Sequence, residues 1–141
     1  MKGKRMEVIG NKTNWVQKEN PSNLYKDFWN YMELIFTYAG TASLSKELES
    51  KEIDDMKAGD VFIQGGFPGH AVIVVDMARH NETGDAIFLL AQSYMPAQEL
   101  QILENPNSDK LGAWYKLNSE EKLITPEWTF LSGSLKTFEK E

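Results

Sequence analysis

Cysteine is absent from the chain, and its absence excludes several kinds of chemistry at once. Without a thiol the chain can form no disulfide bond and no thiolate zinc site, and it supplies no cysteine nucleophile. Histidine is nearly as scarce, with His70 and His80 as its two copies. Two histidines without a third convergent ligand make a poor zinc site, so we expect neither a metal nor another cofactor.

Long apolar runs and clustered positive charge are also missing. No stretch approaches the length of a membrane span, and residues 1–10 lack the long apolar centre of a signal peptide. The formal net charge is −6 and the basic residues are scattered, which argues against nucleic acid as a partner. The cellular location and the oligomeric state cannot be derived from these features.

The residues that are present predict one domain of the α+β class over 1–141. The chain is 41% hydrophobic, which is enough for a real core. Apolar residues at three-and-four spacing predict a helix over 24–38, ended by Gly40 as a left-handed cap, and a shorter helix up to Leu48. Residues 131–141 are expected to form a frayed tail. Apolar and β-branched runs between turn residues predict antiparallel strands at 6–9, 13–16, 61–63, 71–75, 86–91, 114–117 and 125–130.

The chain is organised around residues 59–76, where a Gly-Asp turn, a short strand, a loop of glycines and a proline, and a second strand follow one another. The β-branched run at 72–75 is too apolar to be exposed on either face. His70 opens this buried strand, and a strand end holds an imidazole in a fixed direction beside loops that can admit a substrate. His70 is therefore a catalytic candidate. The alternative is a structural histidine bonded to a neighbouring carbonyl, which is the commoner role of a lone histidine beside a core strand.

A pair of motifs resembles the core of the NlpC-type, papain-like cell-wall peptidases and amidases. They are Asp54-x-Met56-x-x-Gly59-Asp60-Val61-Phe62 and Gly69-His70-Ala71-Val72-Ile73-Val74. The resemblance implies a papain-like fold in which N-terminal helices pack on a small antiparallel sheet. It implies further that His70 is the catalytic base and that Gln92, at the end of the third strand, orients the imidazole. In such enzymes the nucleophile is a cysteine at the start of the preceding helix.

Over almost its full length the chain also resembles the C-terminal part of an uncharacterised bacterial family, a domain of unknown function. This resemblance implies that an N-terminal segment with a cysteine-containing helix is missing, in which case a location in the cell envelope would fit. Four stretches support it, namely Phe36–Ser45, Gly59–Gly66, Ala91–Gln98 and Thr125–Phe130.

The missing nucleophile decides the functional expectation. Ser22 stands near the start of the predicted first helix, where a nucleophile would lie, but a serine there is far more often a helix N-cap. We therefore expect a hydrolase-related domain without peptidase turnover of its own, or alternatively a binding or structural module for a peptide or cell-wall fragment. The residues expected to contact such a ligand beside His70 are Phe67, Tyr94 and Gln64.

Overall fold

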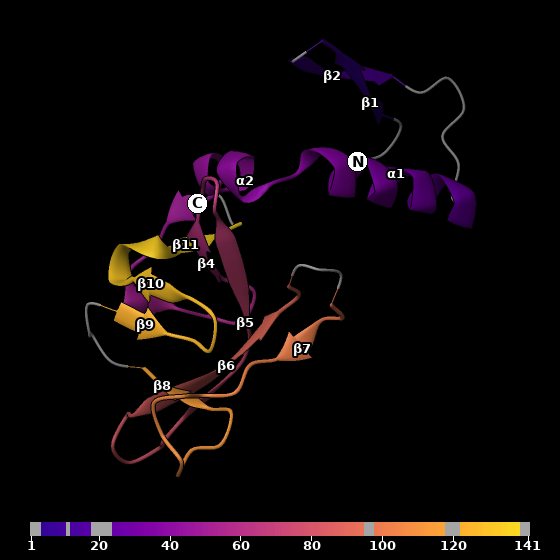
Figure 1. Cartoon of the computed structure of the whole chain (residues 1–141). Coiled ribbons are helices and arrows are strands. Elements are labelled where there is room, and N and C mark those ends of the chain that lie inside the picture. The colour runs from indigo at the N-terminus through magenta and orange to yellow at the C-terminus, as the bar shows by residue number, and fades with distance from the viewer. Residues whose placement is uncertain (1–3, 11, 18–23, 95–97, 118–121, 139–141) are drawn as a thin grey trace. The chain divides into compact units, whose positions relative to one another are not determined.

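A computed structural model describes residues 4–10, 12–17, 24–94, 98–117 and 122–138 (Figure 1). The chain divides into two compact units, Met1–Ala39 and Gly40–Glu141, and each is described by itself. The single domain expected over 1–141 stays a prediction. Within the described ranges, no helix has both the length and the apolar character needed to cross a membrane.

The first unit consists of a β-hairpin and a helix. Strands β1 (Lys4–Ile9) and β2 (Lys12–Gln17) pair in antiparallel fashion, and Gly10 in their turn has a φ of 61°. Helix α1 spans Tyr25–Tyr38, which confirms the predicted helix, yet none of its residues is buried. The expected left-handed cap is wrong, because Gly40 has a φ of −114° and precedes the next helix as its N-cap.

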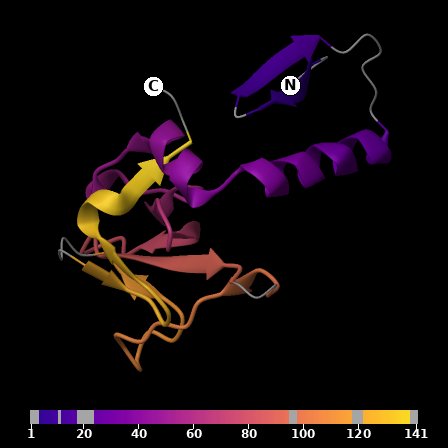
Figure 2. The ribbon, with the colours of Figure 1, turned by 45° about the horizontal axis from the view of Figure 1, so that its top comes forward.

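The second unit is built on an antiparallel sheet in the order β3-β11-β4-β5-β6-β7, with β8 also paired to β6 and with β9 and β10 forming a separate hairpin. In Figures 1 and 2 the yellow C-terminal strand lies beside the purple helix α2, from which it is distant in sequence, and Lys136 Nζ there donates to the Ser45 carbonyl. The elements are α2 (Thr41–Glu47), β3 (Glu49–Ser50), η1 (Ile53–Asp55), β4 (Val61–Gln64), β5 (His70–Arg79), β6 (Ala86–Gln92), β7 (Gln101–Ile102), β8 (Tyr115–Lys116), β9 (Lys122–Ile124), β10 (Thr129–Leu131), η2 (Ser132–Ser134) and β11 (Leu135–Thr137).

The C-terminal stretch differs from the expectation of a frayed tail over 131–141. Strand β11 pairs with both β3 and β4, and Leu135 is completely buried. A leucine buried between two neighbouring strands contributes about 1.5–3 kcal/mol to folding, which explains why this short segment joins the sheet. Residues 139–141 lie outside the described part of the chain.

The two faces of the sheet bury different clusters because successive strand residues point to opposite sides. On one face Val61 and Ile63 pack with Leu48, and α2 covers them through Leu44. The other face holds the larger cluster, which the β9–β10 hairpin covers through Phe130. The buried members of that larger cluster are Met56, Phe62, Val72, Val74, Phe88, Leu90, Leu103, Tyr115, Phe130 and Leu135.

The expectation of a papain-like α+β fold is wrong. The described structure is mostly β-sheet and has two short helices, α1 and α2. Helix α1 belongs to the first unit, and the sheet belongs to the second. Within the second unit, the seven-residue helix α2 covers one face of the sheet and the β9–β10 hairpin covers the other. An amphipathic period predicts that a helix has an apolar face, but it does not specify the partner of that face.

Two glycines allow α2 to lie directly on the β4–β5 loop. A Cβ atom on Gly69 would stand 2.3 Å from Thr41 Oγ1 and 2.6 Å from the Gly66 carbonyl oxygen. A Cβ on Gly65 would stand 2.1 Å from Ser45 Oγ. Any larger residue at these positions would push the helix away from the strand pair.

We predict that Gly69→Ala lowers the free energy of unfolding by about 1–3 kcal/mol, because backbone and side-chain atoms on both sides of the new methyl group must move. Gly133→Ala is the matched control, since a Cβ there would meet nothing within 4 Å. Denaturant unfolding of both variants measures the difference. Equal stabilities of the two variants would contradict the close approach.

Tyr115 is a core residue whose hydroxyl group has a raised pKa. Its hydroxyl donates to the Glu104 carbonyl oxygen at 2.5 Å. Burial raises the pKa of Tyr115 above its ordinary value of 10.0, and the carboxylates of Glu127 and Glu104 raise it further. Above pH 10.0 the unfolded chain therefore loses this proton while the folded chain keeps it.

We predict that stability falls as the pH rises above 10.0, by up to about 1.4 kcal/mol per pH unit from Tyr115 alone. Tyr115→Phe should cost about 1 kcal/mol at neutral pH through the lost hydrogen bond, and should show a shallower alkaline decline. Urea unfolding at several pH values tests this, with the exposed Tyr25→Phe as control. Parallel curves for wild type and Tyr115→Phe would refute the assignment.

Candidate functional site

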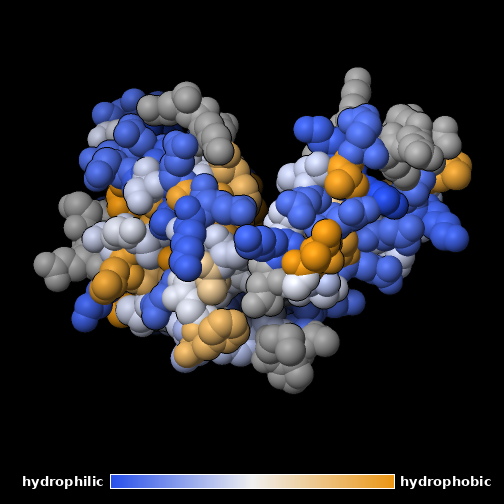
Figure 3. All heavy atoms as spheres, turned by 90° about the horizontal axis from the view of Figure 1, so that it is seen from above, coloured by the Kyte–Doolittle hydropathy of each residue, from blue (hydrophilic) through white to orange (hydrophobic). Residues whose placement is uncertain are grey.

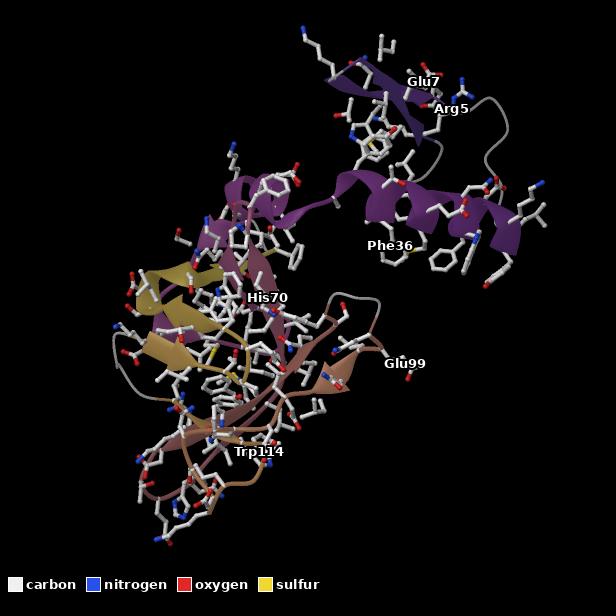
Figure 4. The ribbon with its side chains drawn as sticks, in the orientation of Figure 1. Arg5, Glu7, Phe36, His70, Glu99 and Trp114 are labelled. Atoms are coloured by element: carbon white, nitrogen blue, oxygen red, sulfur yellow. The ribbon has the colours of Figure 1, made fainter. Side chains whose placement is uncertain are left out.

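His70 is the first residue of β5 and points to the face of the sheet that carries the larger cluster. It shares that face with Val72, two residues further along the strand. The residue is 9% exposed, and its ring stacks at 6.1 Å on Phe130, with Trp128 at 5.5 Å and Tyr94 in a T-shaped contact at 5.1 Å. Figure 4 shows His70 within the dense group of side chains of the second unit. Three aromatic rings therefore fix the plane of the imidazole.

A chain of two hydrogen bonds connects this ring to a carboxylate. Gln92, the last residue of β6, is 2% exposed and places its Oε1 2.6 Å from His70 Nε2. The amide nitrogen of Gln92 donates to Glu127 Oε2 at 2.8 Å. The buried amide thus has a partner for its oxygen and for its nitrogen.

These bonds determine the tautomer of the histidine. A carboxylate has no proton to donate, so the group that faces Glu127 must be the NH₂ of Gln92. The amide oxygen then faces His70 and can only accept, which requires the proton on Nε2. Nδ1 of the neutral ring therefore holds a free lone pair. Among the described residues, no hydrogen bond to Nδ1 is found.

A tight turn places Glu127 beside Gln92 and Trp128 beside His70. The Thr125 amide and hydroxyl both donate to the Trp128 carbonyl oxygen at 2.8 Å, and the Trp128 amide donates back to Thr125 Oγ1 at 3.2 Å. Pro126 occupies the second position of this turn, where its fixed φ is favourable. The stretch 125–130, expected to be an edge strand, is therefore a turn followed by β10.

Two of the three residues predicted to contact a ligand adjoin His70, and the third, Phe67, does not. Gln64 lies directly opposite His70 in the β4–β5 register and Tyr94 touches its ring. Phe67 lies in the loop before His70 and is 98% exposed. Ser22 lies outside the described residues. The first two thus share one site with His70, and no contact connects Phe67 to it within the described part of the chain.

The hydroxyls of α2 and the second histidine lie away from His70. The hydroxyls of Thr41 and Ser45 are on α2, which packs against the opposite face of the β4–β5 pair. His80 follows the far end of β5, about 30 Å along the strand by its rise per residue. There its Nδ1 accepts from the Glu82 and Thr83 amides at 3.3 Å, so the two histidines do not converge.

Comparison with known proteins places the chain in a family. Residues 1–137 match the family model described as Domain of unknown function (4846). The chain belongs to this family. No curated protein and no solved structure matched it. This match confirms the resemblance to a domain of unknown function, and no comparison supports the resemblance to NlpC-type enzymes.

Sequence reasoning paired His70 with Gln92 in this family member but missed Glu127, Trp128 and Phe130. This pairing could be predicted because the start of one strand lies beside the end of the next in an antiparallel pair. Glu127 comes from a hairpin 35 positions further along the chain. The signal that could have found it was the Thr-Pro-Glu-Trp order, which is typical of a turn and not of a strand.

We predict that in Glu127→Gln the neutral His70 ring is no longer restricted to one tautomer. An amide at position 127 can donate as well as accept, so Gln92 can rotate by 180° and both neutral tautomers become populated. Nitrogen-15 spectra of the imidazole at a pH where His70 is neutral distinguish protonated from unprotonated ring nitrogens. In wild type Nε2 should be protonated and Nδ1 not.

The matched control is Glu104→Gln, which removes another carboxylate that acts on Tyr115 but does not bond to Gln92. This control should keep the wild-type tautomer. A wild-type protein with the proton on Nδ1 would contradict the assigned directions of the two hydrogen bonds.

Proposed function

We propose that His70 is the general base of a hydrolytic site, with Gln92 and Glu127 as the residues that position it. The observation that supports this most is the continuous Glu127–Gln92–His70 chain of hydrogen bonds, which leaves Nδ1 of the neutral ring unprotonated. A general base needs an accessible lone pair in a fixed direction. The proposal rests on these side chains and not on the fold.

The proposed proton transfer is simple. His70 Nδ1 takes a proton from water, or from a hydroxyl or thiol group brought to the site, as that oxygen or sulfur attacks an acyl carbon. In the imidazolium that forms, Nε2 keeps its proton and donates it to Gln92 Oε1, and the Glu127 carboxylate stabilises the new positive charge through the Gln92 amide. The bond between the acyl carbon and its leaving group then breaks, and the imidazolium gives its Nδ1 proton to the leaving group.

The chain contains no thiol, so an attacking cysteine would not come from these residues. With water as the nucleophile we expect hydrolysis of activated esters and no turnover of unactivated peptide bonds. Amide and peptide bonds of cell-wall fragments are the substrate class that the resemblance to NlpC-type enzymes suggests. Gln64 and Tyr94, which adjoin His70, would then contact the acyl group.

A non-catalytic binding module is the second candidate. The same rings that surround His70 belong to aromatic side chains of the kind that line ligand sites, and Tyr94 and Trp128 are partly exposed. In that case a peptide or glycan fragment would bind beside His70 without being changed.

A comparison of the two histidines separates these candidates. We expect the wild type to hydrolyse p-nitrophenyl acetate faster than buffer, and His70→Ala to lose at least tenfold of that excess rate. His80→Ala is the matched control, because it removes the chain's other histidine and leaves the Gln92 bond intact. The intact protein is used without a histidine tag.

Equal excess rates in His70→Ala and wild type would refute the role of base. Incubation with purified muropeptides then tests the alternative: retention without cleavage, and independent of His70, would favour the binding module. A variant Gln92→Leu should lose activity as His70→Ala does, because the imidazole loses the partner that fixes its tautomer.

A further inference from the structure

One side of α1 carries a continuous row of apolar side chains, which we call the aromatic stripe. Successive helix residues lie about 100° apart around the axis, so the members of this stripe fall within one third of the circumference. Phe36 points away from the hairpin in Figure 4. Leu34, which lines the cavity between the hairpin and α1, lies on the opposite side of the helix, so the hairpin does not cover the stripe. The stripe consists of Tyr25, Phe28, Trp29, Met32 and Phe36.

The four aromatic residues of the stripe are all largely exposed. Their exposed fractions run from 52% for Trp29 to 77% for Phe36. At roughly 150–250 Å² per aromatic side chain, the four present about 500 Å² of surface. On the face of the molecule that Figure 3 shows, hydrophobic residues form separate orange areas among hydrophilic ones. A continuous apolar area as large as the stripe, on so small a unit, is typical of an interaction surface.

The rings of the aromatic stripe are already arranged as one surface. The centroid of the Tyr25 ring lies 6.3 Å from that of Phe28 and 6.2 Å from that of Trp29. The indole Nε1 of Trp29 donates to Glu33 Oε1 of the same helix at 3.2 Å. An apolar partner can therefore cover the indole without leaving its N–H group unpaired. Side chains that are already held in place lose less entropy on association.

The charges of α1 argue against a membrane surface as the partner. Helices that lie on membranes are rich in lysine and arginine on their polar face. Helix α1 has one such residue, Lys26, and two acidic ones, Asp27 and Glu33. The whole chain also has a formal net charge of −6, which anionic lipids would repel. A protein surface is the better match for the stripe.

We propose that the aromatic stripe packs against the same stripe of a second copy of the chain, with the two helices antiparallel. The stripe is wide at one end, where Tyr25, Phe28 and Trp29 lie, and narrow at the other, where Phe36 lies. In an antiparallel pair the wide end of each copy meets the narrow end of the other, and such a match of large to small groups favours close packing. Met32, in the middle of the stripe, then lies at the two-fold axis.

The available area and the weak packing of the first unit both support this dimer. Two stripes together would bury about 1,000 Å², which is the lower limit for a specific protein interface. No residue of α1 is buried, and a two-stranded hairpin by itself is marginally stable in water. Association would cover the second side of the helix and would stabilise the unit by mass action. The dimer does not depend on the role proposed for His70.

Sedimentation equilibrium of the full chain measures the association. We expect a reversible monomer–dimer equilibrium with a dissociation constant on the order of micromolar. Phe36→Glu should weaken it at least tenfold, because the dimer would bury an unpaired charge. Phe67→Glu is the matched control and should change it less than twofold, since Phe67 is an exposed phenylalanine outside the stripe. Nitrogen-15 correlation spectra show whether each variant keeps its fold.

An introduced cysteine tests the antiparallel geometry, because the chain has none of its own. Met32→Cys should form a covalent dimer on oxidation with copper phenanthroline, since two thiols beside the two-fold axis come within reach of a disulfide bond. Lys26→Cys is the control, because position 26 lies more than a quarter turn around the helix from position 32. It should give far less covalent dimer, and equal yields would overturn the antiparallel arrangement.

A protein that stays monomeric at about 200 µM would overturn the proposal. The thiol of Met32→Cys would then show what covers the stripe. Slow reaction of this thiol with Ellman's reagent would indicate cover by the same chain, and fast reaction would indicate a stripe open to a different protein. A dimer that Phe36→Glu does not weaken would overturn the proposal as well.

Discussion

The carboxylate of Glu127 can accept a hydrogen bond but cannot donate one, and the arrangement of the His70 site follows from this constraint. It orients the Gln92 amide, the amide oxygen accepts from His70 Nε2, and the lone pair is left on Nδ1. Without the carboxylate, either orientation of the amide would satisfy its neighbours equally well. Glu127 therefore determines the direction of the hydrogen bond between His70 and Gln92, although Glu127 does not contact the imidazole.

The sheet holds these groups at the required distances. His70 begins β5 and Gln92 ends the neighbouring antiparallel strand β6. Both side chains lie on the same face of the sheet, so they meet diagonally across this strand pair. Phe130 anchors β10 in the larger cluster and brings the Thr125–Trp128 turn over that end of the sheet. Because the amide of Gln92 is buried, loss of either partner would leave a polar group unsatisfied at a cost of about 1–3 kcal/mol. The site and the fold around it are thus mutually dependent.

Local patterns predicted the parts of this structure that depend on local physics. The β-branched run after His70 predicted a buried strand, and the glycines and proline before it predicted the loop between β4 and β5. The partner of an amphipathic helix is a long-range matter, so the apolar period of residues 24–38 gave a helix correctly and the fold class incorrectly. The motif around Gly59 and His70 describes a strand pair, and a strand pair is compatible with more than one fold. Glu127 escaped prediction because its contact with Gln92 depends on how a distant hairpin closes over the sheet.

The use of an amide next to the histidine has a physical rationale. A carboxylate in the place of Gln92, where the side chain is 2% exposed, would be a buried charge, and the cost of desolvating it is several kcal/mol. The amide transmits the orientation while the negative charge stays on Glu127, which is exposed to water. The imidazole is therefore held in one tautomer without a buried charge when it is neutral. The Glu127 carboxylate is separated from the imidazole by the Gln92 side chain, so it acts on the ring through the amide and not by direct contact.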